Sequence, residues 1–310
     1  MYDYSIIFYA EGSKDIGLGH LGRTIALFNY FNKEFRDCKL YFKVDSFSSK
    51  WLLNSGVKYE EEFDDQIKCD VIFIDTTSVS KRFAKRLSNI SKKILISPLF
   101  NLMNLPTHIL VRDASGLNIG NIKSDAILIS NPEFSLITSC FAKPHKRNYQ
   151  SLNIGICLSG GSQDFPIKNL LRTLNAMPEV AQVIYITNSE YAFHGDKLQL
   201  HCRVASPDEL WEVFKNTNVF IGRQGLMVYE AMYRGIPVIS LRESGEVIKI
   251  TTDTAGGDML VYDVNDSERK VTDFLKNRQL LKSINKRLIK QNTGIKSDAL
   301  YLVSRSIVLN

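Results

Sequence analysis

Short apolar runs alternate with helix-like segments along the whole chain, and this alternation constrains the fold more than any other feature. In the first half, "YSIIFYA" (4–10) and "DVIFIDT" (70–76) have the composition of buried strands, and the helix-like "TIALFNYF" (24–31) lies between them. Such runs are typical of parallel strands that are covered on both faces. The pattern resumes with "LNIGICLS" (152–159) and "VFIG" (219–222). We therefore expect an α/β protein with two doubly wound, Rossmann-like domains.

A polar and basic segment, "FAKPHKRNYQ" (141–150), interrupts this alternation. It contains proline and has no periodicity, as is typical of a linker. It predicts an N-terminal domain over 1–145 and a C-terminal nucleotide-binding domain over 150–310, whose last helix could pack back on the first domain. Ligands of doubly wound sheets bind beyond the carboxyl ends of the strands. The expected site is therefore a cleft that the two domains face.

Composition narrows the class of partner. The charge excess, 39 Lys and Arg against 33 Asp and Glu, amounts to +6, which is too small to indicate nucleic acid but suits a phosphate ester. The five cysteines include no C-x-x-C pair, and no metal-binding cluster stands out, so we expect neither metal nor cofactor. The chain has no signal peptide pattern and no apolar run long enough for a transmembrane segment, so we expect a cytoplasmic protein.

The first glycine loop, "GLGHLG", places Gly17, Gly19 and Gly22 in G-x-G-x-x-G spacing between a strand and a helix. His20 lies inside the loop, near a helix N-terminus whose partial positive charge disfavours a second proton on the ring. A neutral imidazole is what a general base needs. We therefore expect His20 to be catalytic, and Gly17, Gly19 and Arg23 to bind the ligand.

The same spacing also supports an NAD-binding oxidoreductase. Asp45 ends the next strand, where a carboxylate that binds ribose would lie. However, six residues (11–16) separate the first strand from Gly17, whereas a dinucleotide turn begins almost directly after its strand. NAD binding by the first loop is therefore retained as an alternative.

The second glycine loop, "LSGGSQD" (158–164), again follows a buried strand and precedes a helix. Gly160 and Gly161 could supply backbone N–H groups, and Ser162 a hydroxyl, to a phosphate group. No lysine follows at the spacing of a P-loop, which argues against ATP binding of that kind.

The third loop lies in "IGRQGLMVYEAMYRGIPVI" (221–239) and repeats this layout. Arg223 follows the strand and suits a diphosphate, and Gly225 lies in the turn before the helix. Glu230, about a turn and a half into the helix, could accept hydrogen bonds from both hydroxyls of a ribose.

Three segments, "DIGLGHLGR", "LSGGSQD" and "GRQGLMVYEAMYRGIPVI", resemble in this order the UDP-sugar hydrolases of the pseudaminic acid pathway. That family includes spore-coat polysaccharide proteins, and its third segment is shared with the N-acetylglucosaminyltransferase that makes lipid II. The resemblance implies a glycosyltransferase-B fold, with the nucleotide bound mainly by the second domain. It also implies that His20 activates water and that Glu230 binds ribose.

The chain departs from the family on the side that would face the sugar. Thr76 and Thr77 follow the "ID" strand end, where the family has an aromatic residue, and Tyr229 stands where some hydrolases have asparagine. The expected function is metal-independent hydrolysis of a UDP-sugar, with release of UDP, in surface glycan biosynthesis. A glycosyltransferase acting on a glycan or lipid acceptor, the NAD-binding oxidoreductase and a non-catalytic nucleotide-binding relative are the alternatives.

Overall fold

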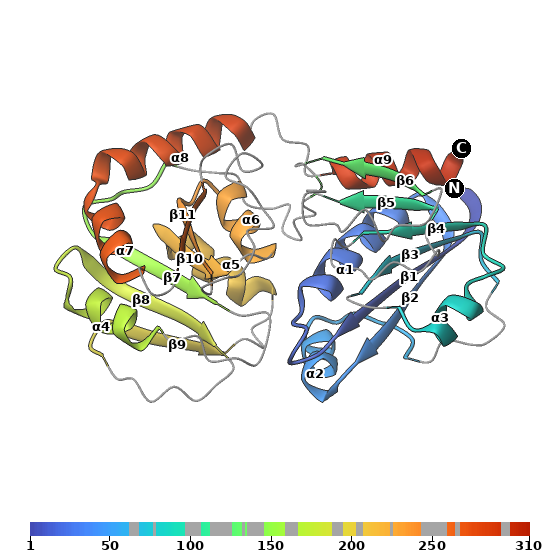
Figure 1. Ribbon diagram of the computed structural model, residues 1–310, viewed down its shortest axis with the longest axis horizontal. Helices are drawn as coiled ribbons and strands as arrows, with labels where there is room; N and C mark the ends of the chain where they lie inside the picture. The colour runs from blue at the N-terminus through green and yellow to red at the C-terminus, as the bar shows by residue number, and fades with distance from the viewer. Residues whose placement is uncertain are drawn as a thin grey trace. The chain divides into compact units, whose positions relative to one another are not determined.

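The chain divides into two units in the computed structural model (Figure 1). Unit 1 comprises Met1–Thr138 and Lys296–Asn310, and unit 2 comprises Ser139–Ile295. The structure describes residues 1–61, 68–76, 79–96, 107–111, 126–131, 134, 146–158, 167–187, 195–202, 207–223, 226–242, 259–263, 267–292 and 298–310.

Unit 1 contains a parallel sheet with strand order β2-β1-β3-β4-β5-β6. Its strands are β1 (Tyr2–Gly12), β2 (Phe35–Val44), β3 (Val71–Asp75), β4 (Lys92–Leu95), β5 (His108–Val111) and β6 (Ile127–Ser130). Its helices are α1 (Gly19–Phe31), α2 (Ser46–Asn54), α3 (Lys81–Arg86) and α9 (Ala299–Leu309). The chain leaves β1 toward β2 on one side and leaves β3 toward β4 on the other. The topological switch point, where such sheets bind ligands, therefore lies between β1 and β3.

Apolar side chains cover both faces of this sheet, which explains the nearly continuous apolar runs in its central strands. On the face of α1, the ring of Phe8 stacks on Phe73 at 4.9 Å, and Phe31 packs against both. On the opposite face, Tyr9 contacts Phe83 of α3 at a centroid distance of 4.4 Å. Because side chains alternate along a strand, successive residues of β1 pack in turn against the helices on one face of the sheet and those on the other.

Unit 2 contains a second parallel sheet, with strand order β12-β11-β10-β7-β8-β9. Its strands are β7 (Leu152–Cys157), β8 (Val180–Thr187), β9 (Leu198–Cys202), β10 (Val219–Arg223), β11 (Val238–Arg242) and β12 (Met259–Asp263). Its helices are α4 (Lys168–Ala176), α5 (Pro207–Asn216), α6 (Leu226–Tyr233), α7 (Ser267–Lys276) and α8 (Arg278–Asn292). By the same reasoning, the switch point of this sheet lies between β7 and β10.

Gly222 of β10 allows α6 to pack closely on this sheet. A Cβ atom at Gly222 would lie 2.8 Å from the side chain of Val228 and 2.9 Å from that of Phe220. Both distances are too short for carbon atoms, so only glycine fits beside α6 without a local shift. The strand end and the helix that follows it are therefore held together tightly at the switch point.

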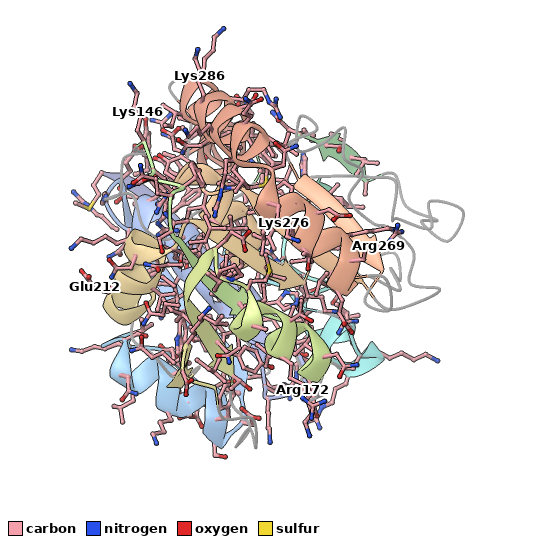
Figure 2. The ribbon with its side chains drawn as sticks, turned by 90° about the vertical axis from the view of Figure 1, so that its left-hand side faces the viewer. Lys146, Arg172, Glu212, Arg269, Lys276 and Lys286 are labelled. Atoms are coloured by element: carbon pink, nitrogen blue, oxygen red, sulfur yellow. The ribbon has the colours of Figure 1, made fainter. Side chains whose placement is uncertain are left out.

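Exposed charged side chains lie on α4, α5, α7 and α8 of unit 2, and at Lys146 ahead of β7. The side chains labelled in Figure 2 are all exposed: Lys146, Arg172, Glu212, Arg269, Lys276 and Lys286. On α4, by contrast, Leu170 and Leu174 are buried. Helix α4 therefore presents an apolar stripe to the core and a polar face to solvent. None of the helices in the described part of the chain is both long and apolar enough to cross a membrane.

The last helix, α9, packs on unit 1. The ring of Tyr301 stacks on Tyr30 of α1 at 5.0 Å. Lys92 donates hydrogen bonds from Nζ to the carbonyl oxygens of Ile307 and Val308. The charged Lys92 thus binds backbone carbonyl groups at the C-terminus of α9, which have no hydrogen-bond partner within the helix.

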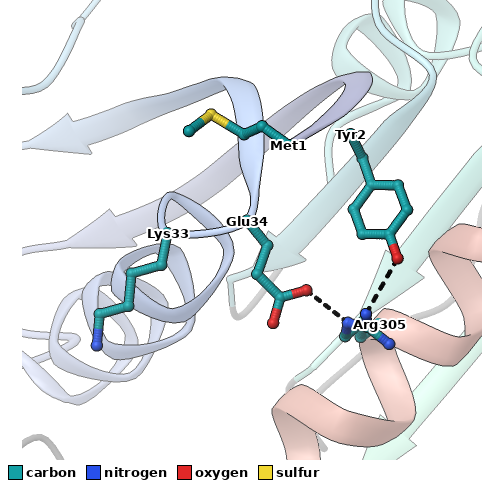
Figure 3. Close-up of a pocket in the computed structure, with 5 residues that line it drawn as sticks. All are labelled: Met1, Tyr2, Lys33, Glu34 and Arg305. Carbon is teal, nitrogen blue, oxygen red and sulfur yellow. Dashed lines mark hydrogen bonds and ion pairs between the residues drawn. The ribbon is translucent and has the colours of Figure 1, made fainter.

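An ion pair between Arg305 of α9 and Glu34 borders a shallow hollow on unit 1. Arg305 donates from Nε to Glu34 at 2.7 Å and from Nη2 to the Tyr2 hydroxyl at 3.2 Å (Figure 3). The hollow measures about 390 Å³ and is lined by Met1, Tyr2, Lys33, Glu34 and Arg305. These residues lie at the amino end of β1, which is the opposite end from the switch point.

Candidate functional site

The first strand continues beyond its predicted end. The sequence predicts it over 4–10, but β1 extends to Gly12 because Gly12 still pairs with β2. A Cβ atom at Gly12 would lie 2.4 Å from Cδ1 of Leu21, so α1 packs directly against the strand end. The turn that follows is closed by a 2.7 Å bond from the amide of Gly17 to the Ser13 carbonyl. Gly17 has φ = 86°, which favours glycine.

Gly19 begins α1, and its surroundings are open. Of the residues that the structure describes, none lies within 4 Å of the position that a Cβ atom would take. No described side chain caps the N-terminus of α1 through a hydrogen bond. The first backbone N–H groups of α1 can therefore meet an anion. The roles of Gly17 and Gly19 in ligand binding remain predictions.

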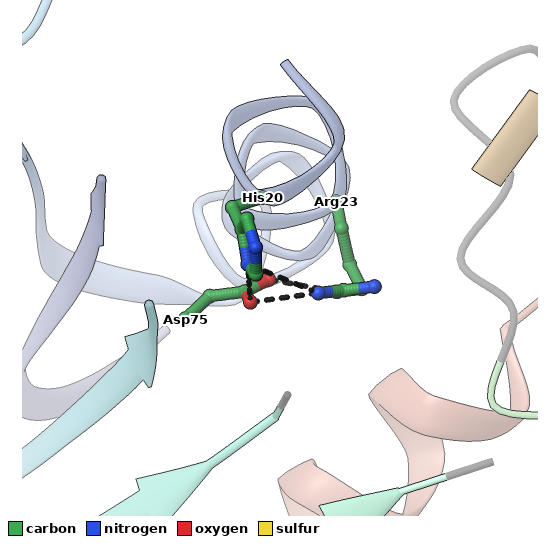
Figure 4. Close-up of polar contacts among 3 residues, drawn as sticks. All are labelled: His20, Arg23 and Asp75. Carbon is green, nitrogen blue, oxygen red and sulfur yellow. Dashed lines mark hydrogen bonds and ion pairs between the residues drawn. The ribbon is translucent and has the colours of Figure 1, made fainter. Parts of the chain in front are cut away.

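His20, on α1, contacts a carboxylate from the end of strand β3 (Figure 4). Its Nδ1 lies 2.5 Å from Oδ1 of Asp75, the last residue of β3, and its side chain is 10% exposed. An ionised carboxylate can only accept a hydrogen bond, so Nδ1 carries the proton and donates it. In the neutral ring, Nε2 then holds the lone pair, as a general base requires.

Arg23 binds the same carboxylate from the next turn of α1. Its Nε lies 2.7 Å from Oδ2 of Asp75, and its Nη2 lies 2.7 Å from Oδ1 (Figure 4). Burial raises the pKa of Asp75, but Arg23 and then His20 outweigh this effect and hold that pKa below its ordinary value. Burial lowers the pKa of Arg23, and Asp75 more than reverses this, so the pKa is raised. The wholly buried Asp75 is therefore ionised and paired.

Sequence reasoning missed Asp75, which the structure brings into the candidate site. The sequence does show a carboxylate at the end of the buried strand "DVIFID". However, only the sheet order reveals that this strand lies next to β1 and so brings Asp75 to His20. The same finding changes the description of Arg23, which the sequence predicts to bind ligand. Two of its nitrogens bind Asp75, and ligand binding by Arg23 remains a prediction.

Asp45 has protein partners on both carboxylate oxygens. Oδ1 accepts a bond from the amide of Ser48 at 2.9 Å, which caps α2, and Oδ2 accepts one from the amide of Lys14 at 2.8 Å. Burial raises the pKa of Asp45, but these amides outweigh it and lower the pKa. Asp45 therefore holds the glycine loop against α2. The carboxylate that the NAD alternative requires for ribose is engaged elsewhere.

Unit 2 places two predicted site residues on β10 and α6. Arg223 is the last residue of β10, half-buried, beside the switch point between β7 and β10. Glu230 is 6% exposed on α6, and its charge acts on Arg234, one turn further along the helix. Arg234 also donates to the Glu230 carbonyl at 3.0 Å. Their ligand contacts remain predictions, and four further predicted residues lie outside the described part of the chain: Gly160, Gly161, Ser162 and Gly225.

Comparison of the sequence with known proteins finds a distant relative. No family model matches the chain. The uncharacterized protein MJ1062 of Methanocaldococcus jannaschii is 22% identical over 272 residues, which cover 77% of this chain. The match spans 56% of that relative, so the chain corresponds to about half of its length.

Solved structures match over almost the whole chain. Acinetobacter baumannii MurG is 11% identical, with a TM-score of 0.58, over 97% of this chain and 99% of that one. S. aureus MnaA, solved with UDP, is 10% identical, with a TM-score of 0.62, over 91% of each chain. The spinosyn rhamnosyltransferase SpnG, complexed with spinosyn aglycone, is 11% identical, with a TM-score of 0.60, over 98% and 99%. The chain has the glycosyltransferase-B fold. The fold expected from the sequence is thereby confirmed.

Proposed function

We propose that this protein is an enzyme that acts on a UDP-sugar, with His20 as the general base. The observation that carries the proposal is the 2.5 Å contact of His20 Nδ1 with Asp75, which leaves Nε2 to accept a proton. Both residues belong to the switch point of unit 1, because His20 follows β1 and Asp75 ends β3. A histidine oriented in this way is suited to removing a proton from a nucleophilic hydroxyl.

The proposed reaction begins when Nε2 of His20 takes a proton from water. The water oxygen bonds to the anomeric carbon as the bond from that carbon to the diphosphate oxygen breaks, and the bonding electrons leave with UDP. The proton remains on the His20 ring, where the Asp75 carboxylate stabilises the positive charge, and is then lost to solvent. Arg223 and the backbone N–H groups of the glycine loops would bind the departing diphosphate.

The comparisons support a UDP-sugar as the substrate class. MnaA of the same fold was solved with UDP, and SpnG is named as a rhamnosyltransferase. The resemblance of the three sequence segments to UDP-sugar hydrolases favours water as the acceptor, and release of UDP by hydrolysis stays a prediction.

Transfer of the sugar to a glycan or lipid hydroxyl is the second candidate. The observation that favours it is the likeness in fold to glycosyltransferases, among them SpnG. The same pair, His20 and Asp75, would deprotonate a sugar hydroxyl in place of water. NAD binding receives less support, because the carboxylate oxygens of Asp45 bind the amides of Lys14 and Ser48.

The test is to incubate the purified protein with a panel of UDP-sugars and to quantify UDP with and without added glycan and lipid acceptors. Release without acceptor indicates hydrolysis, and release that requires an acceptor indicates transfer. We expect His20→Ala to lower the rate about 10²- to 10⁴-fold. His108→Ala is the control, because His108 begins β5 at the amino ends of the strands, whereas the switch point lies at their carboxyl ends. The proposal would be refuted if the protein did not bind UDP and released no UDP under any of these conditions.

A further inference from the structure

The carboxyl end of β1 carries a second carboxylate, Glu11, which the proposed mechanism does not use. Its Oε1 accepts a hydrogen bond from the Tyr9 hydroxyl at 2.8 Å and another from Nζ of Lys43 at 3.2 Å. The Glu11 side chain is only 12% exposed, whereas that of Lys43 is 73% exposed. Both partners thus bind the same oxygen and fix the orientation of the carboxylate.

The other oxygen of Glu11 is available. In the part of the chain that the structure describes, Oε2 accepts no hydrogen bond. Burial, followed by the charge of Glu11, raises the pKa of the Tyr9 hydroxyl, so Tyr9 remains a donor at neutral pH. A carboxylate can accept several hydrogen bonds, and this one uses a single oxygen for its protein partners.

Glu11 flanks the switch point on the face opposite to His20. Tyr9 packs on Phe83 of α3, and strand side chains alternate, so Glu11 lies on the α3 side of the sheet. Asp75 is in register with Ala10 and therefore lies on the α1 side, where it meets His20. Two carboxylates thus border the same strand ends, one from each face.

We infer that Glu11 binds a hydroxyl group of the sugar on which the enzyme acts. This inference rests on the proposed function and names the residue that recognises the sugar. A fixed carboxylate oxygen accepts hydrogen bonds from sugar hydroxyls, and such bonds to a charged group are stronger than those between neutral groups. The hydroxyl belongs either to the sugar of the UDP-sugar or to a sugar acceptor.

The experiment compares Glu11→Gln and Glu11→Ala with the wild type on the UDP-sugar that the wild type turns over fastest. Asp3→Asn is a matched control, because Asp3 lies at the other end of β1 and pairs with Arg36 of β2 at 3.3 Å. We expect Glu11→Ala to raise KM about 10- to 100-fold, Glu11→Gln less, and Asp3→Asn not at all. Because we expect unit 2 to bind the nucleotide, the Kd of UDP alone should be unchanged in these variants, which also reports intact folding.

The two sources of the hydroxyl give different results. A rise in KM for the UDP-sugar assigns Glu11 to the donor, and a rise only in KM for an added acceptor assigns it to the acceptor. Tyr9→Phe, which removes one of the bonds that orient the carboxylate, should have the same effect to a smaller extent. The inference would be overturned if Glu11→Gln, Glu11→Ala and Tyr9→Phe all kept KM values within about twofold of wild type for both substrates. The proposed function would then still stand. A wild type that releases no UDP would instead refute the proposed function.

Discussion

Nδ1 of His20 lies 2.5 Å from Oδ1 of Asp75, although the two residues are 55 positions apart in the chain. Parallel pairing of β1 with β3 brings them together, since Ala10 and Asp75 are in register at the strand ends. The glycine turn then places the first residues of α1 above Asp75. The proposed base is therefore assembled from two strand ends and not from the glycine loop alone.

Asp75→Asn should lower kcat and leave KM largely unchanged. Asp75 is wholly buried, so it acts on the substrate only through His20. Asparagine can present an N–H group to Nδ1 and thereby favour the tautomer that carries its proton on Nε2. We expect kcat to fall by about 10²-fold or more, as measured by UDP release at a temperature well below unfolding.

The control for this variant is Asp70→Asn. Asp70 lies just before the amino end of β3 and accepts a bond from the amide of Ser5 at 2.8 Å. It should retain wild-type kcat. Equal activity of the Asp75 variant and the wild type would show that Asp75 has no part in orienting His20.

Asp75 should also make the folded state sensitive to acid. Its pKa in the folded protein is held below the ordinary value of 3.8, mainly by Arg23 against the effect of burial. A depressed pKa contributes stability that is present above the ordinary value and is lost as pH falls through the folded pKa. The loss therefore falls below the ordinary pKa of 3.8, and urea unfolding followed from about pH 6 down to about pH 2 should show it.

The same measurement on Asp75→Asn separates the effect of this group from that of other carboxylates. At neutral pH we expect a loss of about 3–5 kcal/mol in the free energy of unfolding, because Arg23 is left buried without its carboxylate. The remaining dependence on pH should be shallower than in the wild type. An unchanged slope would mean that Asp75 contributes little to acid sensitivity.

Gly12→Ala and Gly19→Ala should have opposite consequences. The Cβ atom added at Gly12 would lie 2.4 Å from Cδ1 and 2.7 Å from Cγ of the buried Leu21, so α1 must shift. We expect a loss of about 1–3 kcal/mol in the free energy of unfolding. At Gly19 the added methyl group meets no described residue, so the protein should remain stable while its affinity for UDP-sugar falls.

Thermal unfolding and calorimetric titration with the UDP-sugar test the two glycines together. Reduced affinity with normal stability in Gly19→Ala would support approach of the ligand to the first turn of α1. Wild-type affinity in that variant would place the ligand away from this turn.

Glu230→Gln should weaken binding of the nucleotide if this carboxylate receives the ribose hydroxyls. We expect the Kd of UDP to rise about 10-fold, whereas 2′,3′-dideoxy-UDP should bind the wild type and the variant alike. Glu212→Gln on the exposed face of α5 is the control. If the variant loses affinity for both nucleotides equally, Glu230 acts through Arg234 and the packing of α6, and not through ribose.

Local sequence was sufficient for the class of fold and for much of the site. Apolar runs, glycine turns and helix periodicity depend on neighbours within a few residues, so β1, α1 and the position of His20 on the turn between them were predictable. Even so, β1 extends two residues beyond its predicted carboxyl end, because Glu11 and Gly12 continue to pair with β2. Neither residue type favours a strand, so the local sequence gives no indication that these two positions pair with a neighbouring strand.

The partners of the charged groups were decided by tertiary structure. Asp45 was the ribose ligand of the NAD alternative, but it caps α2 and binds the amide of Lys14. Asp75 had no predicted role, and it binds both His20 and Arg23. A buried carboxylate must find donors wherever the sheet order brings them, and the order β2-β1-β3 is set by the packing of whole helices on both faces. The sequence by itself determined which segments form strands and which residues could do chemistry. Only the packed sheet decided which carboxylate meets the histidine.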